Sequence, residues 1–165
     1  SPIHQRGLFS TSPISEGETI VIWGGVLFTE EEINQSRAAQ HSYVCIDDGL
    51  YIGGIPAEGN SPDDFMNHSC DPNAWLIDEV TIVARKHILP NTEVTIDYAT
   101  IRADYASGWT CHCGARFCRG FITEDDYQIT DLQDRYMNHF SPIVNKLIGK
   151  HRVSLKLTGE KQKDF

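Results

Sequence analysis

The stretch Asn67-His68-Ser69-Cys70-Asp71-Pro72-Asn73 says more about the fold than any other part of the chain. It places an amide, an imidazole and a thiol side by side and then ends on turn-forming residues. Further along, Glu93-Val94-Thr95-Ile96-Asp97-Tyr98 is a strand-like run that ends on a tyrosine. Cys111-His112-Cys113 and Cys118-Arg119-Gly120 then add three cysteines at metal-ligand spacing. The order of these motifs makes the pattern specific, because each of them alone is weak.

Composition indicates one folded domain with an acidic surface. The chain has 165 residues and is 40% hydrophobic, enough to bury a core. Its net charge of −9 argues against direct nucleic acid binding, which needs clustered cations, and favours a basic partner. A plainer interpretation is that the acidic surface keeps the protein soluble. No apolar run reaches the roughly 18 residues of a membrane span, and no basic, apolar leader opens the chain, so we expect neither a membrane segment nor a signal peptide.

The local patterns predict a mostly β fold with short helices. Runs of β-branched and aromatic residues predict short strands at 19–23, 43–46, 50–52, 74–77, 81–84 and 93–96. Asp47-Asp48-Gly49 predicts a hairpin between the second and third of these. Thr29 followed by Glu30–Glu32 is a capping-box pattern that predicts an exposed helix over 30–39. Ser61-Pro62 predicts one helical turn that runs into Met66.

The pattern changes to helical after Gly120. Residues 131–136 have helical spacing, and Ser141-Pro142 starts a second helix with an apolar face made by Ile143, Val144, Leu147 and Ile148. Gly149 and Lys150 are expected to end it. We therefore expect a helical extension over 123–150 that packs on the sheets, and a polar flexible tail over 151–165.

The cysteines favour a metal over disulfides. Their number, five, is odd, and Cys111, Cys113 and Cys118 supply three soft ligands where zinc takes four. The alternatives are free or redox-active thiols, and His68 or His112 as a competing ligand. Cys45 lies on a predicted strand and is expected to be a small buried hydrophobic residue. An odd number of cysteines at metal-ligand spacing fits an intracellular reducing compartment, either the nucleus or the cytoplasm.

Taken in order, the motifs resemble the SET domain of protein-lysine methyltransferases with its short cysteine-rich post-SET segment. The resemblance covers roughly residues 3–122. It implies small twisted sheets with a knot-like crossing, at which the strand of Tyr98 meets the Asn67–Cys70 segment. It divides the chain into a SET domain at 1–108 and a post-SET zinc-binding segment at 109–122. It also implies that Cys70 is the fourth Zn²⁺ ligand.

The resemblance implies S-adenosylmethionine as methyl donor, with S-adenosylhomocysteine as product. Arg6-Gly7-Leu8 corresponds to the segment that cradles the methionine part of the cofactor, although Gln5 stands where a glycine is common. Asn67 would contact the amino-acid end and the His68 backbone the adenine. A turn-forming amide and a core histidine are the ordinary alternatives for these two. Phe121 would cover the adenine ring or, alternatively, be a core aromatic residue.

Tyr98 falls on the catalytic position of the family. An isolated tyrosine at a strand end is usually a half-buried strand aromatic, and the motif reverses that interpretation. Tyr43 is a candidate second tyrosine of the catalytic channel. Ile96 lies in the substrate channel, where SET enzymes carry Phe or Tyr, and its lack of a hydroxyl predicts di- or trimethylation. Asp64 precedes Phe65 where many SET domains have an arginine.

The leading hypothesis is a protein-lysine N-methyltransferase acting on a basic protein or peptide, with a histone tail as one candidate substrate. The second is a catalytically inactive SET domain that binds lysine-bearing tails. A small zinc protein with a structural or redox role explains only the cysteines. We expect a monomer, because the predicted helix at 30–39 offers no dimer seam.

Overall fold

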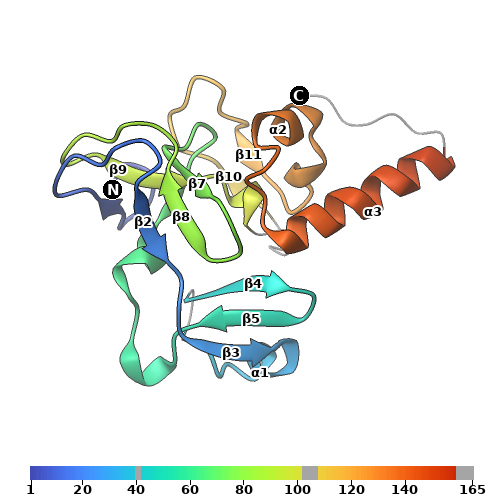
Figure 1. Ribbon diagram of the computed structural model, residues 1–165, viewed down its shortest axis with the longest axis horizontal. Helices are drawn as coiled ribbons and strands as arrows, with labels where there is room; N and C mark the ends of the chain where they lie inside the picture. The colour runs from blue at the N-terminus through green and yellow to red at the C-terminus, as the bar shows by residue number, and fades with distance from the viewer. Residues whose placement is uncertain (40–41, 102–107, 159–165) are drawn as a thin grey trace.

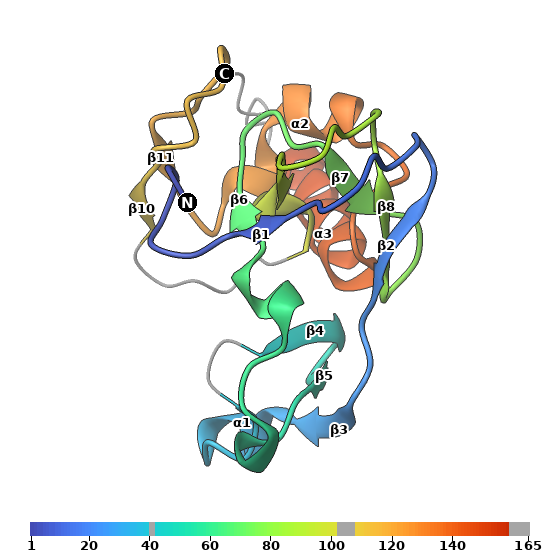
Figure 2. The same cartoon turned by 90° about the vertical axis from the view of Figure 1, so that its left-hand side faces the viewer.

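The computed structural model describes residues 1–39, 42–101 and 108–158. Over these residues the chain forms four small sheets (Figures 1 and 2). The first sheet has the strand order β1 (Leu8–Phe9), β9 (Glu93–Ile96) and β6 (Asn67–His68), and the second has the order β2 (Thr19–Ile22), β8 (Thr81–Ala84) and β7 (Ala74–Leu76). The third sheet has the order β3 (Val26–Thr29), β5 (Leu50–Gly53) and β4 (Tyr43–Asp47). In the fourth, β10 (Trp109–Thr110) pairs with β11 (Phe121–Ile122). The predicted mostly β fold of small sheets and short helices is confirmed.

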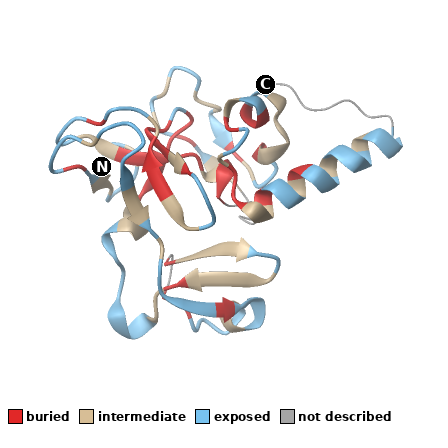
Figure 3. Ribbon diagram, viewed as in Figure 1, coloured by how far each residue is buried: buried red, intermediate tan, exposed pale blue. Residues whose placement is uncertain are grey.

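The main core lies where the first two sheets meet. Its buried residues include Leu76, Ile82, Val94 and Ile96, each 1% exposed or less. In Figure 3 the buried segments gather in this upper part of the molecule, whereas the β3–β5–β4 sheet is mostly half-buried. That sheet and α1 lie apart from the other sheets in both Figure 1 and Figure 2. The β4–β5 hairpin pairs around Asp47–Gly49, as its sequence predicts.

The capping box at Thr29 is confirmed, but its helix is shorter than predicted. The Thr29 hydroxyl accepts from the Glu32 N–H, and the Glu32 carboxylate accepts from the Thr29 N–H, at the start of α1 (Glu30–Asn34). The helix ends early because Ser36 has a φ of 57°, in the left-handed region that interrupts helices. Two 3₁₀ turns follow β5, namely η1 (Pro56–Glu58) and the predicted turn η2 (Pro62–Phe65).

The C-terminal part packs around a second apolar cluster. The elements of the C-terminal part are η4 (Asp126–Gln128), α2 (Thr130–Arg135) and α3 (Pro142–Thr158), and they pack against η3 (Tyr98–Thr100). Leu132, Tyr136, Phe140, Val144 and Ile148 are buried together with Ala99, the residue after Tyr98. Among the described residues, no helix is both long enough and apolar enough to cross a membrane.

The predicted end of the last helix at Gly149 and Lys150 is wrong. α3 continues through Gly149 to Thr158, so at least residues 151–158 are helical rather than a loose tail. A single glycine costs a helix only about 1 kcal/mol relative to alanine, and the Lys, Leu and Arg that follow are good helix formers. The remainder of the predicted tail, 159–165, lies outside the described residues.

Candidate functional site

The parallel pairing of β6 with β9 brings the two long motifs together. Asn67 pairs with Thr95 and His68 with Ile96, and the Ser69 N–H donates to the Ile96 carbonyl at 3.1 Å. Asn73 completes the junction, because its Oδ1 accepts from the Thr95 N–H at 2.9 Å and its Nδ2 donates to the Glu93 carbonyl at 2.8 Å. The asparagine that ends the heptapeptide therefore binds the strand that leads to Tyr98.

A cavity of about 840 Å³ lies beside this junction. That volume is typical of sites that hold cofactors and small ligands. Predicted site residues on its wall are Arg6, Tyr43, Asn67, Ile96 and Tyr98. Gly7, Leu8, His68 and Phe121 are not on the wall, and Leu8 instead lines a smaller hollow of about 330 Å³.

Tyr98 is held at both its backbone and its hydroxyl. Its N–H donates to His68 Nδ1 at 3.2 Å, and its hydroxyl donates to the Met66 carbonyl at 2.8 Å. Its ring packs edge-on against His68, with 5.6 Å between ring centroids, and against Trp109 at 5.8 Å. Sequence reasoning missed Trp109, although an aromatic residue two positions before the C-x-C pattern was a usable signal.

The opposite wall comes from the β4–β5 hairpin. Tyr43 is half-buried and its ring lies edge-on to Tyr51, with centroids 6.0 Å apart, and both line the cavity. Cys45 was predicted to be buried, and that is wrong: it is half-buried on the cavity wall, and its thiol donates to the Asp47 carbonyl at 3.0 Å. Its strand faces the cavity rather than the main core, so the side chain stays partly accessible.

Asn67 ties the N-terminal segment to β9. Its Nδ2 donates to the Arg6 carbonyl at 2.7 Å and to Glu93 Oε1 at 2.6 Å. A Cβ on Gly7 would lie 2.2 Å from the same Glu93 oxygen, so a larger residue there would displace the Glu93 carboxylate from this position. The predicted contact of Gly7 with a cofactor stays a prediction.

His68 lies behind Tyr98 rather than on the cavity wall. The residue is only 4% exposed, and burial, assisted by the charge of Arg119, lowers its pKa to about 4 against the opposing effect of Asp97. Phe121 is 51% exposed, so the core alternative for this residue is wrong. The predicted cofactor contacts of both residues stay predictions.

The acidic residue that departs from the family pattern has a local role. Asp64 Oδ2 accepts from the Ser61 N–H at 2.7 Å and from Asn60 Nδ2 at 3.1 Å, which stabilises the start of η2. Asp64 also lies on the cavity wall together with Asp63 and Glu58, so this side of the cavity is acidic.

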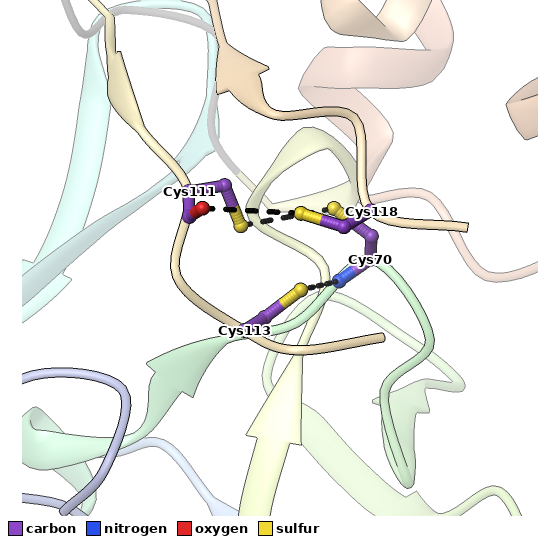
Figure 4. Close-up of side chains that lie close together, drawn as sticks. All are labelled: Cys70, Cys111, Cys113 and Cys118. Carbon is purple, nitrogen blue, oxygen red and sulfur yellow. Dashed lines mark hydrogen bonds between the residues drawn. The ribbon is translucent and has the colours of Figure 1, made fainter. Parts of the chain in front are cut away.

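Four cysteine sulfurs gather at a second site, behind Tyr98. The Sγ atoms of Cys70, Cys111, Cys113 and Cys118 all lie within 4.8 Å of one another (Figure 4). A zinc–sulfur bond of about 2.3 Å places the sulfurs of a tetrahedron roughly 3.8 Å apart, and the Cys70 and Cys111 sulfurs are 3.9 Å apart. Cys70 comes from the heptapeptide and the others from the C-terminal segment, so the cluster joins two distant parts of the chain.

The surroundings of the sulfurs fit thiolates held by a cation. Backbone N–H groups point at three of them: Arg119 N lies 3.3 Å from Cys70 Sγ, Gly120 N 3.4 Å from Cys118 Sγ, and Cys70 N 3.5 Å from Cys113 Sγ. Burial raises the pKa of Cys70 and raises that of Cys111 to about 12. For Cys113 burial is outweighed by N–H donors, and its pKa falls to about 7. Among the described residues, the group whose ligand atoms all lie close together contains the four cysteines and neither His68 nor His112, so four cysteines form the ligand set that fits zinc.

Comparison with known proteins agrees with this geometry. The family model described as "SET domain" matches residues 5–99. The chain belongs to the SET domain family. In structure it is similar to the methyltransferase domain of human histone-lysine N-methyltransferase SETMAR, with a TM-score of 0.55 and 19% identity, over 73% of this chain and 55% of that one. At that identity the likeness shows the fold of this SET domain.

Two relatives are histone-lysine N-methyltransferases by name. Histone-lysine N-methyltransferase 2B of Homo sapiens is 31% identical over 134 residues, which is 74% of this chain and 5% of that protein. Histone-lysine N-methyltransferase ash1 of Drosophila melanogaster is 30% identical over 139 residues, which is 76% of this chain and 6% of that protein. The chain thus spans only a small part of the length of these relatives.

Proposed function

We propose that this SET domain is a protein-lysine N-methyltransferase that uses S-adenosylmethionine and acts on a basic protein tail. The observation that carries the proposal is the cavity beside the β6–β9 junction, because the residues that the family motifs single out, Asn67, Ile96 and Tyr98, share its wall. The names of the relatives support the same class of activity.

The cofactor would supply an electrophilic methyl group carried on a sulfonium. Arg6, Gly7, Leu8, Asn67, His68 and Phe121 are the residues proposed to hold it, and the cavity has the volume for it. Arg6 and Asn67 already line the wall. The other four would contribute backbone contacts or a covering surface from its margin.

The chain's own residues would make the lysine nucleophilic by excluding water. A free lysine has a pKa of about 10.4, so its ammonium must lose a proton before the nitrogen can attack. Val44, Ile52, Ile96 and Ile101 make part of the cavity wall apolar. Such surroundings disfavour the ammonium form and lower the lysine pKa.

Tyr98 would orient the neutral amine. Tyr98 lines the cavity, and its hydroxyl donates to the Met66 carbonyl, which fixes the direction of the O–H bond. A fixed polar oxygen at this point can align the amine and stabilise polarised C–H groups of the transferred methyl. Tyr43, on the facing wall, would help to align the lysine side chain, and no covalent enzyme intermediate is needed.

Zinc would have a structural role at the four cysteines. Bound by Cys70, Cys111, Cys113 and Cys118, it would hold the C-terminal segment against the heptapeptide. The proposed division is then a SET domain at 1–108, a zinc-binding segment at 109–122 and a helical extension after it.

The proposed substrate is a lysine in a basic segment, with histone tails as one candidate. The chain carries a net charge of −9, and Glu58, Asp63 and Asp64 line the cavity. Opposite charge steers a basic peptide toward such a surface. An intracellular protein, nuclear or cytoplasmic, that acts as a monomer fits this substrate and the reduced cysteines.

A methyl-transfer assay with radiolabelled S-adenosylmethionine tests the proposal. Zinc-loaded wild type is compared with Tyr98→Phe on core histones and on a lysate of basic proteins. Removing one positioned hydroxyl is expected to lower turnover by about 10²-fold or more, with cofactor affinity retained. Tyr127→Phe, a half-buried tyrosine of the C-terminal part, is the matched control and should keep wild-type turnover.

The alternative, an inactive SET domain that binds lysine-bearing tails, predicts a different result. Wild type would then bind basic peptides in calorimetry without transferring label to any of them. Equal turnover by wild type and Tyr98→Phe would contradict the role proposed for the tyrosine.

A further inference from the structure

A buried arginine links the cysteine cluster to the strand that ends at Tyr98. Arg119 follows Cys118 directly, and its side chain is 3% exposed. Its Nη1 and Nη2 donate to the two carboxylate oxygens of Asp97 at 2.7 and 2.8 Å, and its Nε donates to Asp126 Oδ2 at 2.7 Å. This two-pronged geometry is the strongest pairing that an arginine makes with a carboxylate.

Asp97 in turn shapes the turn that presents Tyr98. Its side chain is fully buried, and its Oδ1 accepts from the Ala99 N–H at 3.0 Å, which caps η3. Its carbonyl accepts from the Thr100 hydroxyl at 2.7 Å. The carboxylate therefore sets the course of the backbone on the far side of Tyr98, while the His68 ring holds the Tyr98 N–H.

The C-terminal extension reaches the same carboxylate. The Tyr136 hydroxyl, in a side chain with no exposure, donates to Asp97 Oδ2 at 3.2 Å. Asp126 anchors the Arg119 guanidinium from the other side and accepts from the Thr123 N–H and hydroxyl. Buried charges are costly unless each is fully paired, and here every ionised group has several partners. Although burial raises the pKa of Asp97, the hydrogen bonds and charge of Arg119 outweigh it, and the pKa lies below its usual value.

We propose that Arg119 is a positioning residue that fixes Tyr98 through Asp97. Folding of the cysteine segment at 109–122 would then set the position of the Tyr98 side chain. The inference rests on the proposed function, in which Tyr98 orients the lysine. Arg119 itself is not among the residues that line the cavity. Its position in the chain, next to one cysteine and with its N–H on the sulfur of another, makes it the physical link between the two sites.

Arg119→Lys tests the link, because lysine keeps the positive charge but cannot make the two-pronged pair. The matched control is Arg85→Lys: Arg85 also pairs with an aspartate, with Nη1 2.7 Å from Asp71 Oδ1, but does not contact Asp97. With zinc loaded to one equivalent in all proteins, Arg119→Lys is expected to lower kcat at least about tenfold, with KM for cofactor changed less than about threefold. Arg85→Lys should keep wild-type kcat.

A readout independent of activity is the ¹⁹F spectrum of protein labelled with fluorotyrosine, in which the Tyr98 resonance is assigned by its absence from Tyr98→Phe. We expect this resonance to shift or broaden in Arg119→Lys and to stay in place in Arg85→Lys. An unchanged resonance and kcat in Arg119→Lys, with only a lower melting temperature, would show a merely structural role and overturn the inference. If wild type transfers no methyl group, the proposed function fails, and the resonance still decides whether Arg119 positions Tyr98.

Discussion

At the scale of single residues, we propose that Ile96 decides how much room the transferred methyl groups have. It is 1% exposed, lines the cavity and lies two residues before Tyr98. It pairs with His68 across the β6–β9 junction, so the main chain holds its side chain firmly in place. Because the side chain has no hydroxyl to hold a water molecule, we propose that it leaves space for a lysine that already carries a methyl group.

Wild type is therefore expected to form di- or trimethyl-lysine, and Ile96→Tyr to shift the product toward monomethyl-lysine. The matched control is Ile96→Phe, which adds the same ring without the hydroxyl and should keep the higher products. Either ring overpacks the wall, at a cost of about 1–3 kcal/mol in stability. Mass spectrometry of the methylated peptide measures the outcome, and a wild type that makes monomethyl-lysine alone would contradict the prediction.

At the scale of elements, the cysteine segment at 109–122 has little structure of its own. β10 and β11 pair over only two residues each, and the local apolar cluster contains three buried residues, Cys70, Cys111 and Ile122. So small a core cannot offset the backbone entropy of ordering the segment. Metal binding by the four cysteines would supply the missing free energy.

Removing the metal with a chelator is expected to raise amide hydrogen exchange over residues 109–122 while β7 and β8 stay protected. Cys118→Ser should lower the bound zinc below one equivalent and give the same exchange pattern without chelator. Cys45→Ser, far from the cluster on β4, is the control and should keep one equivalent. Full protection of the segment in metal-free protein would show that its packing alone suffices.

At the scale of the whole molecule, the C-terminal extension shares its core with η3, the turn that begins at Tyr98. Ala99 of η3 is buried against the cluster formed by α2 and α3, and the Ser141 N–H donates to the Thr100 carbonyl at 2.7 Å. The Lys146 ammonium of α3 also pairs with the Asp47 carboxylate on β4, the hairpin strand that carries Tyr43. The extension thus contacts both the turn that begins at Tyr98 and the strand that carries Tyr43, and we propose that it folds together with the SET domain.

Ile148→Ala, in the buried face of α3, is expected to lower the free energy of unfolding by about 2–5 kcal/mol in a single cooperative transition. Leu157→Ala on the same helix, at a residue 83% exposed, should change it by less than about 0.5 kcal/mol. Denaturant titration followed by circular dichroism and by tryptophan fluorescence measures both. Two separate transitions would show that the extension folds independently.

Local chemistry made much of the fold and site predictable from sequence. The capping box at Thr29, the hairpin at Asp47–Gly49 and the strand before Tyr98 depend on neighbours in the chain, so short patterns predicted them. The ordered motifs identified the family, and three of the four clustered cysteines follow from their spacing alone.

Only the tertiary structure decided what connects these parts. The pairing of Asp97 with Arg119, the packing of Trp109 on Tyr98 and the half-buried position of Cys45 join residues whose local patterns carry no sign of one another. The extension of α3 to Thr158 likewise overrode a local glycine signal. The physical reason is the same in each case: a short pattern reports backbone preference and periodicity, whereas the partner of a buried charge or ring is set by which distant segments pack together.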